Sequence, residues 1–498
     1  METWLELLLL AAVSWPFARV ALSRPFLRRA RAFPAKGAAA LGALFLYAAL
    51  VFGAAAAGPG ALRSLTGAAV LTWLILRWRA RGVFGVSRGL PAGSLVLAPV
   101  GPWRDHRFYQ KQAALYGPVF KMSNFVRPTV CIVGLDLAAD LLREHDDALG
   151  VGYVPSSRFV PSGFLRYMPP DLHRRYRGVF RRAFSKEVID PHLPLIQRRI
   201  RQELGRLAEE SSQEGGARPR ACLERMVRTS FLSLFFGMRA AEPNGSRLLT
   251  VQSMIDWRQA YRHPPWRIRR LHAEVDDLLT HQVREWERGG GDADPQPPSI
   301  LHQWLRSEPE LIHDPAAVFN LLYISAAGGG DLADLLVWIV KMLGDHQEWA
   351  ERVATEGTSA DLAGRIVLET LRLEQSEYIV RRALTDIRFR EKRIPRGWQI
   401  RICVRESHRD AARFDDPETF NPDRFLDRPS AGSYVPFGIS RHACLGQYIT
   451  LAFGRALVEE LAGGFEWDVV EDGPREYGGF HWRPSSKLSL VLNPRSRP

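Results

Sequence analysis

The sequence predicts a mostly helical protein with a smaller β portion, preceded by apolar segments suited to a membrane. Three observations lead to this fold class. Residues 170–340 carry long helical patterns, residues 119–133 and 382–405 carry β-branched runs, and residues 1–82 contain uncharged apolar stretches. The 498 residues provide enough sequence for a large core. We therefore expect a membrane-anchoring region at residues 1–82 and one folded domain at residues 83–498.

The membrane-anchoring region contains two or three hydrophobic segments. Ala38–Gly58 is uncharged and about as long as a bilayer-spanning helix, while Leu7–Ala18 and Leu65–Leu76 are shorter. Arg and Lys are concentrated at residues 19–37 and from Arg77 onward, which places both stretches on the cytoplasmic side. Either all three segments span, or the first lies in the interface and the other two form a hairpin. Both arrangements leave the folded domain facing the cytoplasm, at the endoplasmic reticulum or at a bacterial plasma membrane.

The folded domain begins with alternating strand and helix signals. Val119–Met122 and Thr129–Val133 are predicted to be strands, with Arg127-Pro128 as the turn between them. Leu137–Arg143 is predicted to be a helix. Helical patterns then dominate, with a loop rich in glycine, aspartate and proline at residues 289–298.

A long apolar helix is predicted at Phe319–Leu343, interrupted by Ala326-Ala327-Gly328-Gly329-Gly330-Asp331. Each glycine inside a helix costs about 1 kcal/mol relative to alanine. We infer that a flat or bulky group packs against the backbone at this point.

Composition limits the class of partner. The net charge is +13, and the arginines are spread along the chain. Such a surface suits an anionic membrane or an acidic protein, and it is also typical of an ordinary solvated surface. We expect no nucleic-acid partner because no nucleic-acid motif is recognised. The 4 cysteines provide no disulfide framework, so we expect a reducing compartment.

One cysteine, Cys444, differs from the others in its surroundings. It lies in the loop Phe437–Gly446, after Arg441 and His442 and just before a predicted helix whose free N–H groups stabilise negative charge. Gly438 allows the backbone to pass close to a flat partner. A single thiolate, nearby cations and room for a flat group describe a haem site. The remaining cysteines are expected to be buried structural residues: Cys131, Cys222 and Cys403.

Two further groups of charged residues accompany this loop. Glu369 and Arg372 are three residues apart on one helical face, and Arg424 lies in a turn-rich segment. They form either an exposed salt bridge of little energetic value or a buried network that holds the loop before Cys444. His173 and Arg177 also share a helical face, so both can reach one carboxylate.

Together these residues resemble the cytochrome P450 family over roughly residues 100–495. The motifs occur in the family's order: His173 with Arg177, Glu369-Thr370-Leu371-Arg372, Arg381 five residues before Asp386, Pro422-Asp423-Arg424-Phe425, and Phe437–Gly446.

The resemblance implies a prism-like fold, rich in helices with small sheets, and a haem-thiolate catalytic domain. It implies haem b as cofactor, with Cys444 as the axial ligand of the iron. Further residues are implied to bind the cofactor, to support it or to lie over its distal face: His173, Arg177, Arg381, Phe437, Gly438 and His442 as cofactor-binding residues; Glu369, Arg372 and Arg424 as a structural network; Ala327 and Gly328 on the distal side.

The chain departs from the family pattern at two places. Ser440 replaces the second glycine of the cysteine loop, which is tolerated if its backbone torsion is ordinary. The family's distal helix usually reads Ala-Gly-x-acid-Thr. If Ala327-Gly328 is aligned with Ala-Gly of the pattern, Gly330 takes the position of the acid and Asp331 that of the threonine. If the alignment is shifted by one residue, Asp331 takes the position of the acid and Leu332 that of the threonine. Neither register provides a hydroxyl, so protons are expected from Asp331, from water or from the substrate.

The resemblance favours a membrane-bound monooxygenase with an altered distal proton relay that acts on a lipophilic small molecule. Two alternatives remain: a peroxygenase, isomerase or dehydratase that acts on a peroxide, and a haem-binding protein without turnover. A monooxygenase needs electrons, and the chain has no room for a flavin or nicotinamide domain beside the haem domain. We therefore expect a separate donor, either an NADPH-dependent reductase or a ferredoxin.

Overall fold

The computed structural model describes residues 89–95, 101–124, 127–151, 164–255, 265–288, 297–356, 361–376, 378–427, 432–478 and 481–495. These residues belong to two compact units. The β unit contains the described residues up to 151 and Ile379–Glu406, and the helical unit contains residues 164–378 and 407–495. The membrane segments predicted within residues 1–82 lie outside the described residues.

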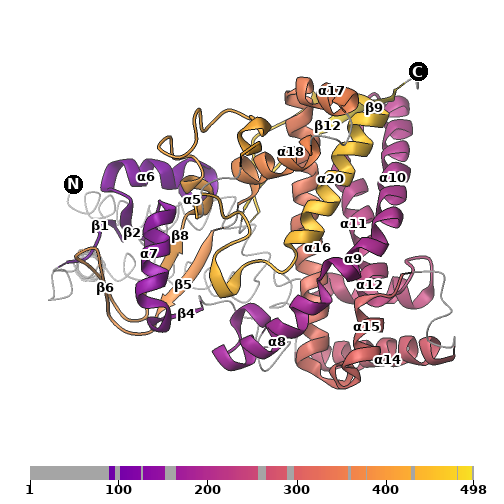
Figure 1. Ribbon diagram of the computed structural model, residues 1–498, viewed down its shortest axis with the longest axis horizontal. Helices are drawn as coiled ribbons and strands as arrows, with labels where there is room; N and C mark the ends of the chain where they lie inside the picture. The colour runs from indigo at the N-terminus through magenta and orange to yellow at the C-terminus, as the bar shows by residue number, and fades with distance from the viewer. Residues whose placement is uncertain are drawn as a thin grey trace, which may run out of the picture. The chain divides into compact units, whose positions relative to one another are not determined.

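The β unit is built on a six-stranded sheet with the order β1-β2-β3-β8-β5-β4 (Figure 1). β2 is antiparallel to β3, β3 is parallel to β8, and β5 is antiparallel to both of its neighbours. A buried cluster that includes Cys131 and Cys403 packs against this sheet. The elements of the unit are β1 (Ala92–Ser94), α5 (Gly101–Arg104), α6 (Phe108–Tyr116), β2 (Val119–Asn124), β3 (Arg127–Ile132), α7 (Leu135–His145), β4 (Leu149–Val151), β5 (Ile379–Ala383), β6 (Ile387–Phe389), β7 (Lys392–Ile394) and β8 (Gln399–Ile402), followed by the short helix α19 (Val404–Ser407).

The turn predicted at Arg127-Pro128 is wrong. Arg127 pairs with Asn124 and Pro128 pairs with Ser123, so both residues already belong to β3 and the chain reverses between Asn124 and Arg127. Proline is tolerated at the start of a strand, where its missing N–H removes no essential ladder hydrogen bond. The two predicted strands are present as β2 and β3, and the predicted helix is α7.

The helical unit is assembled around α16, with α11 and α20 packed against it (Figure 1). Prolines stand at the first turn of several helices because a proline has no N–H to leave unsatisfied there. Glycines at φ 71° and φ 68° end α10 and α11. The helices are α8 (Pro170–Ala183), α9 (Lys186–Ile189), α10 (Leu193–Glu214), α11 (Pro219–Phe236), α12 (Pro243–Ile255), α14 (Pro265–Arg288), α15 (Ile300–Ser307), α16 (Pro315–Asp345), α17 (Gln347–Glu356), α18 (Leu362–Thr370) and α20 (Gln447–Gly464).

Two small antiparallel sheets complete the helical unit. They are formed by β9 (Phe465–Glu471) with β12 (Ser489–Pro494) and by β10 (Glu476–Tyr477) with β11 (Trp482–Arg483). A single large apolar core joins α10, α11, α16, α18 and α20 to β9 and β12. The mixture of long helices and small sheets agrees with the fold class that the sequence predicts.

The long apolar helix predicted at Phe319–Leu343 is present as α16. It is continuous from Pro315 to Asp345, and the side chain of Asp314 caps its first turn by accepting from the Ala316 N–H at 2.8 Å. A methyl group added at Gly329 would be 3.6 Å from Phe231, which is an ordinary contact, and one added at Gly330 would meet no protein atom within 4 Å. Contacts within the protein therefore do not require these glycines, and burial of the rest of α16 keeps the helix intact.

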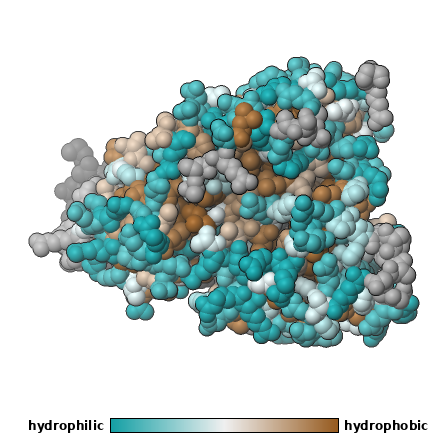
Figure 2. All heavy atoms as spheres, in the orientation of Figure 1, coloured by the Kyte–Doolittle hydropathy of each residue, from teal (hydrophilic) through white to brown (hydrophobic). Residues whose placement is uncertain are grey.

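In the described part of the chain, α16 alone has the length and apolar composition of a membrane-spanning helix. Because 61% of its most apolar window is buried inside the protein, its composition is explained by its place in the core. Hydrophilic side chains cover most of the visible surface over α8, α12 and α14 (Figure 2).

Candidate functional site

The Cys444 loop is closed by its own backbone. The Cys444 N–H donates to the Phe437 carbonyl at 2.7 Å, and the Gly438 N–H donates to the Val435 carbonyl at 3.0 Å. Gly438 has a φ of 84°, which favours glycine. The Cys444 side chain is exposed, and it stands two residues before Gly446, the N-cap of α20. The positive end of the α20 dipole therefore lies close to the sulfur and favours its thiolate form.

Ser440 does not have the ordinary torsion that would make its replacement of glycine neutral. Its φ is 58°, in the left-handed region, where a side chain costs roughly 1 kcal/mol. Ser440 begins a short 3₁₀ turn, Ser440–His442, and its carbonyl accepts from the Ala443 N–H at 3.0 Å. The turn holds the residue in this strained conformation.

α8 brings the predicted basic residues to the same loop. His173 is buried, and the centre of its ring is 4.3 Å from that of His442. Burial lowers the pKa of Arg177, and the negative charge of the Cys444 thiolate acts in the opposite direction. Arg177 and Cys444 are thus within electrostatic range of each other. His173 meets the Cys444 loop through the ring of His442.

The structure brings Glu369, Arg372 and Arg424 together as a buried network. Arg372 donates from Nε and Nη2 to the two oxygens of Glu369 at 2.7 and 2.8 Å, and both side chains have no exposed area. Arg424 Nε donates to Glu369 Oε1 at 2.9 Å. Of the two arrangements that the sequence left open, the buried network is the one present.

Arg372 also ties together the segment between α18 and the cysteine loop. Its Nη1 donates to the carbonyls of His408 and Pro417 at 2.9 and 2.7 Å. The sequence places these acceptors far from Arg372, and only folding brings them within reach. The network therefore fixes the backbone on which the cysteine loop rests.

The direct link from this network to the cysteine loop is His408, which sequence reasoning missed. The Val435 N–H donates to His408 Nε2 at 2.9 Å, so Nε2 carries the lone pair and Nδ1 carries the proton. Nδ1 is 2.9 Å from Ser376 Oγ, whose hydroxyl donates to the Leu371 carbonyl at 2.7 Å. Burial, followed by the charges of Arg372 and Arg409, lowers the pKa of His408 to about 3.

Tyr434 supports the same link, since its hydroxyl donates to the Leu368 carbonyl at 2.7 Å. Tyr434 is therefore bonded directly to the helix that carries Glu369, and Val435 is connected to the same segment through His408. His408 lies in the polar run Glu406-Ser407-His408-Arg409-Asp410, which by composition resembles an exposed loop. No local signal distinguishes it from a solvated histidine.

On α16, the predicted distal residues share one partly exposed face. Ala327, Gly328 and Asp331 are half-buried, whereas Gly329 and Asp334 are buried. The spacing of 327, 328 and 331 is that of one helical face. The side chain of Asp331 is 45% exposed, and Gly330 is exposed beside it. A strip of small residues with one carboxylate therefore borders open space.

Arg381 belongs to the β unit and is described there alone. It lies in β5, pairs with Ile400 and Val151, and is buried. Its role in cofactor binding stays a prediction.

The residues of the helical unit fit a haem. Cys444 offers a single exposed sulfur, and in the described part of the chain no three or more His, Cys, Asp or Glu side chains gather to hold a metal by themselves. Haem fits these residues because its ring already supplies most of the iron ligands, so that the protein needs to provide only one sulfur. Arg177 beside the sulfur is a partly desolvated cation that suits an anionic group.

Comparisons with known proteins agree with this site. The cytochrome P450 family model matches residues 358–477, which contain the Glu369–Arg372–Arg424 network and the Cys444 loop. Abscisic acid 8'-hydroxylase 3 of Oryza sativa is 23% identical over 410 residues, covering 75% of this chain and 79% of the rice protein. Cytochrome P450 26A1 of Gallus gallus is 24% identical over 437 residues, covering 77% of this chain and 86% of the chicken protein.

Solved structures share the fold. Retinoic-acid-bound cyanobacterial CYP120A1 superposes with a TM-score of 0.63 at 21% identity, covering 82% of this chain and 100% of that chain. A zebra fish cytochrome P450 with abiraterone superposes with a TM-score of 0.62 at 18% identity, covering 78% of this chain and 100% of that chain. The fold, the family model and the named relatives all support a cytochrome P450, a haem-thiolate oxidoreductase of the monooxygenase type.

Proposed function

We propose that this chain inserts one oxygen atom of dioxygen into a lipophilic small molecule, with its haem bound through Cys444. The second oxygen atom leaves as water, and the reaction takes up two electrons from a separate donor and two protons from solvent. When bound, the haem supplies the iron that activates dioxygen. Insertion forms a carbon–oxygen bond to the substrate, and the substrate hydrogen becomes the hydroxyl hydrogen of the product.

The observation that carries this proposal is the arrangement around Cys444. An exposed sulfur at the N-terminal end of α20 lies within electrostatic range of Arg177, while the buried ring of His173 packs against the half-buried ring of His442 in the same loop. In the proposed site, His173 and Arg177 bind the haem carboxylates, with Arg381 as a third partner. Phe437, Gly438 and His442 form the loop that supports the haem.

The network behind the loop keeps the sulfur in position. Glu369, Arg372 and Arg424 hold the preceding segment, and His408 connects that segment to Val435. Because each buried polar group in this chain of contacts has a partner, the loop has little freedom to move.

On the opposite side we propose Asp331 as the group that holds a proton, in place of the family's usual hydroxyl. Asp331 shares the open face of α16 with Ala327 and Gly328, whose small side chains leave space for dioxygen and substrate. Gly330 takes no part through a side chain and keeps this space clear. Asp331 receives protons from solvent through its exposed part and releases them at its carboxylate oxygen.

The substrate class that we propose is a lipophilic acid with an isoprenoid skeleton. The relatives are named for abscisic acid hydroxylation, and the superposed cyanobacterial protein binds retinoic acid. Both compounds combine a methyl-substituted six-membered ring, an unsaturated chain and a carboxylate. We further propose that residues 1–82 anchor the chain, that residues 83–498 face the cytoplasm, and that an NADPH-dependent reductase or a ferredoxin delivers the electrons.

The cofactor assignment is tested by the spectrum of the reduced, carbon-monoxide-bound protein. The wild type is expected to show the red-shifted thiolate band, and Cys444→Ser is expected to lose it. Cys222→Ser is the matched control, because Cys222 is buried in α11 and donates to the Glu203 carbonyl, a bond that serine keeps. A thiolate band in Cys444→Ser would refute the ligand assignment.

The reaction is tested by product formation from retinoic acid and abscisic acid. One assay supplies reductase, NADPH and oxygen, and a second supplies hydrogen peroxide. Product in the first assay supports the monooxygenase proposal, whereas product with peroxide alone would overturn it. Asp331→Asn is expected to lower the yield of product per NADPH, and Asp331→Thr, which restores the usual hydroxyl, is expected to retain more of it than Asp331→Asn.

A further inference from the structure

His481 is a buried histidine that directly adjoins the proposed distal carboxylate. It lies just before β11, and its side chain is 2% exposed. Its Nδ1 is 3.9 Å from Asp331 Oδ1, and its Nε2 is 3.1 Å from Asp334 Oδ2. The imidazole ring therefore stands between two carboxylates of α16, one half-exposed and one buried.

The backbone around His481 is anchored to the rest of the helical unit. The Gly478 N–H donates to the His481 carbonyl at 3.0 Å, and the indole N–H of Trp338 on α16 donates to the Trp482 carbonyl at 3.0 Å. This second bond fixes the residue next to His481 against α16. The ring is therefore held at α16 by its backbone as well as by its bond to Asp334.

Asp334 is held in its ionised form. Burial raises the pKa of Asp334, but the hydrogen bond from His481 and the charges of Arg483 and Arg220 outweigh it, so that the pKa stays below its ordinary value. Arg483 Nε is 2.5 Å from Asp334 Oδ2, and Arg220 binds Oδ1. A carboxylate so firmly ionised orients the ring through Nε2–H and does not carry protons onward itself. Exchange of a proton is left to Nδ1, the nitrogen on the side of Asp331.

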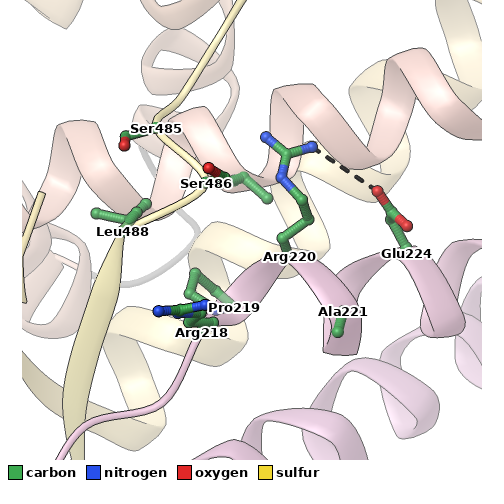
Figure 3. A pocket seen from close by; sticks show the side chains of 9 residues that line it. Arg218, Pro219, Arg220, Ala221, Glu224, Ser485, Ser486 and Leu488 are labelled. Carbon is green, nitrogen blue, oxygen red and sulfur yellow. Dashed lines mark ion pairs between the residues drawn. The ribbon is translucent and has the colours of Figure 1, made fainter. Parts of the chain in front are cut away.

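Figure 3 shows the outer side of this cluster. Arg220 projects beside a hollow of about 220 Å³ that is also lined by Ser485, Ser486 and Leu488, and it is 3.7 Å from Glu224. Arg220 thus connects a solvent-facing ion pair to the buried Asp334. A guanidinium does not release protons in proteins. Arg220 therefore supplies positive charge to Asp334 but does not carry protons to it from the hollow.

We propose that His481 and Asp331 share one exchangeable proton on the open face of α16, with Asp334 positioning the ring. At 3.9 Å the two atoms are beyond direct hydrogen-bond reach, so a small rotation of the half-exposed Asp331 side chain closes the gap before the doubly protonated ring passes its proton from Nδ1 to Asp331 Oδ1. The ring keeps its Nε2 proton, and solvent reloads the pair through the exposed part of Asp331. This inference rests on the proposed function, which assigns the distal proton to Asp331. Because it acts through Asp331, His481 is a positioning residue for proton delivery.

The charges that face the pair favour such sharing. Asp331 and Asp334 face the ring from α16, Arg483 faces it from β11, and Arg220 reaches Asp334 from α11. The negative charge of Asp334 is balanced by Arg483 and Arg220. Asp331 Oδ1, 3.9 Å from Nδ1, stabilises a proton on the ring until it is transferred.

The first experiment compares wild type with His481→Gln, using retinoic acid as substrate. Glutamine Nε2 can keep the bond to Asp334 but offers no exchangeable proton near neutral pH. With reductase and NADPH, we expect about a tenfold or larger fall in product per NADPH, a larger solvent deuterium isotope effect and loss of the wild-type pH dependence. Turnover driven by hydrogen peroxide, which already carries two protons, is expected to change little.

Matched controls distinguish loss of proton delivery from loss of folding. His192→Gln replaces a buried histidine elsewhere in the helical unit, whose Nε2 is 3.4 Å from the Pro298 carbonyl. This variant should keep the wild-type product per NADPH, isotope effect and pH dependence. The thiolate band in the carbon-monoxide spectrum reports that each variant is folded and loaded. Wild-type yield, isotope effect and pH profile in a folded His481→Gln protein would overturn the inference.

A second experiment requires no turnover and remains decisive if His481→Gln fails to fold. Histidine ring signals are followed through a pH titration of the reduced carbon-monoxide complex, in wild type and in Asp331→Asn. Removing the carboxylate 3.9 Å from Nδ1 should move the His481 titration to lower pH, because the negative charge that stabilises the protonated ring is gone. An unchanged His481 titration would overturn the shared proton. If the wild type forms no product with reductase but this titration shifts as expected, the proposed function fails and the coupled pair stands.

Discussion

Lowering the pH from 7 to 5 is expected to destabilise the helical unit through His408. In the native state its Nε2 accepts from the Val435 N–H, and its pKa is lowered to about 3 from an ordinary value of 6.5. The unfolded state therefore binds a proton more readily than the native state. Stability is fully present above pH 6.5 and falls as the pH drops toward 3, because unfolding takes up one proton over this interval.

The expected size of the effect follows from the two pKa values. With a pKa of 6.5 in the unfolded chain and about 3 in the native protein, protonation favours unfolding by about 0.2 kcal/mol at pH 7 and by about 2 kcal/mol at pH 5. The difference, about 2 kcal/mol, hardly changes if the native pKa is one unit higher. His408 is fully buried, so solvent screening does not reduce it.

The assay compares wild type with His408→Gln, which has no titrating group at this position. Urea unfolding of both haem-loaded proteins is followed by tryptophan fluorescence at pH 7 and pH 5. All other titrating groups are common to the two proteins and cancel in the comparison. Wild type should lose about 2 kcal/mol more than the variant between the two pH values. Equal losses would refute the neutral, buried state of His408.

Substitutions at three other positions test the support of the cysteine loop. Ser440→Gly should leave stability unchanged or raise it by up to about 1 kcal/mol, because glycine accepts the φ of 58°, whereas Ser440→Val should lower it; urea unfolding measures both. Glu369→Gln leaves the buried Arg372 without its carboxylate and should cost about 3–5 kcal/mol, measured in the same way. Arg177→Leu, which removes the cation beside Cys444, should lower the haem content of the purified protein more than Arg174→Leu, a change at an exposed arginine of the same helix.

Each of these expectations has a contradicting result. A Ser440→Val protein as stable as Ser440→Gly would mean that the left-handed torsion is not maintained. Wild-type stability in Glu369→Gln would mean that the buried carboxylate does not balance its two arginines. Equal haem content in Arg177→Leu and Arg174→Leu would mean that Arg177 does not bind the haem carboxylates.

Much of the fold class was predictable because helices and strands leave periodic patterns in local sequence. The apolar runs of α16 and α18 and the β-branched runs of β2 and β3 are of this kind. The error occurred where a local signal was outweighed by pairing, since Arg127-Pro128 forms part of β3 although the dipeptide favours a turn. The three glycines of α16 remain helical, as predicted, because the rest of that helix is buried.

The sequence by itself determined the cofactor class, because a thiolate ligand and basic partners for anionic groups require particular residue types in a particular order. Cys444, His173, Arg177, Glu369 and Arg372 are visible for that reason. Tertiary structure alone decided which charges are buried and which distant groups meet. The bond between His408 and Val435, the left-handed Ser440 and the position of His481 between Asp331 and Asp334 depend on packing across long stretches of chain. Burial and ion pairing at such separations leave no periodic trace in the sequence, so only the folded chain reveals them.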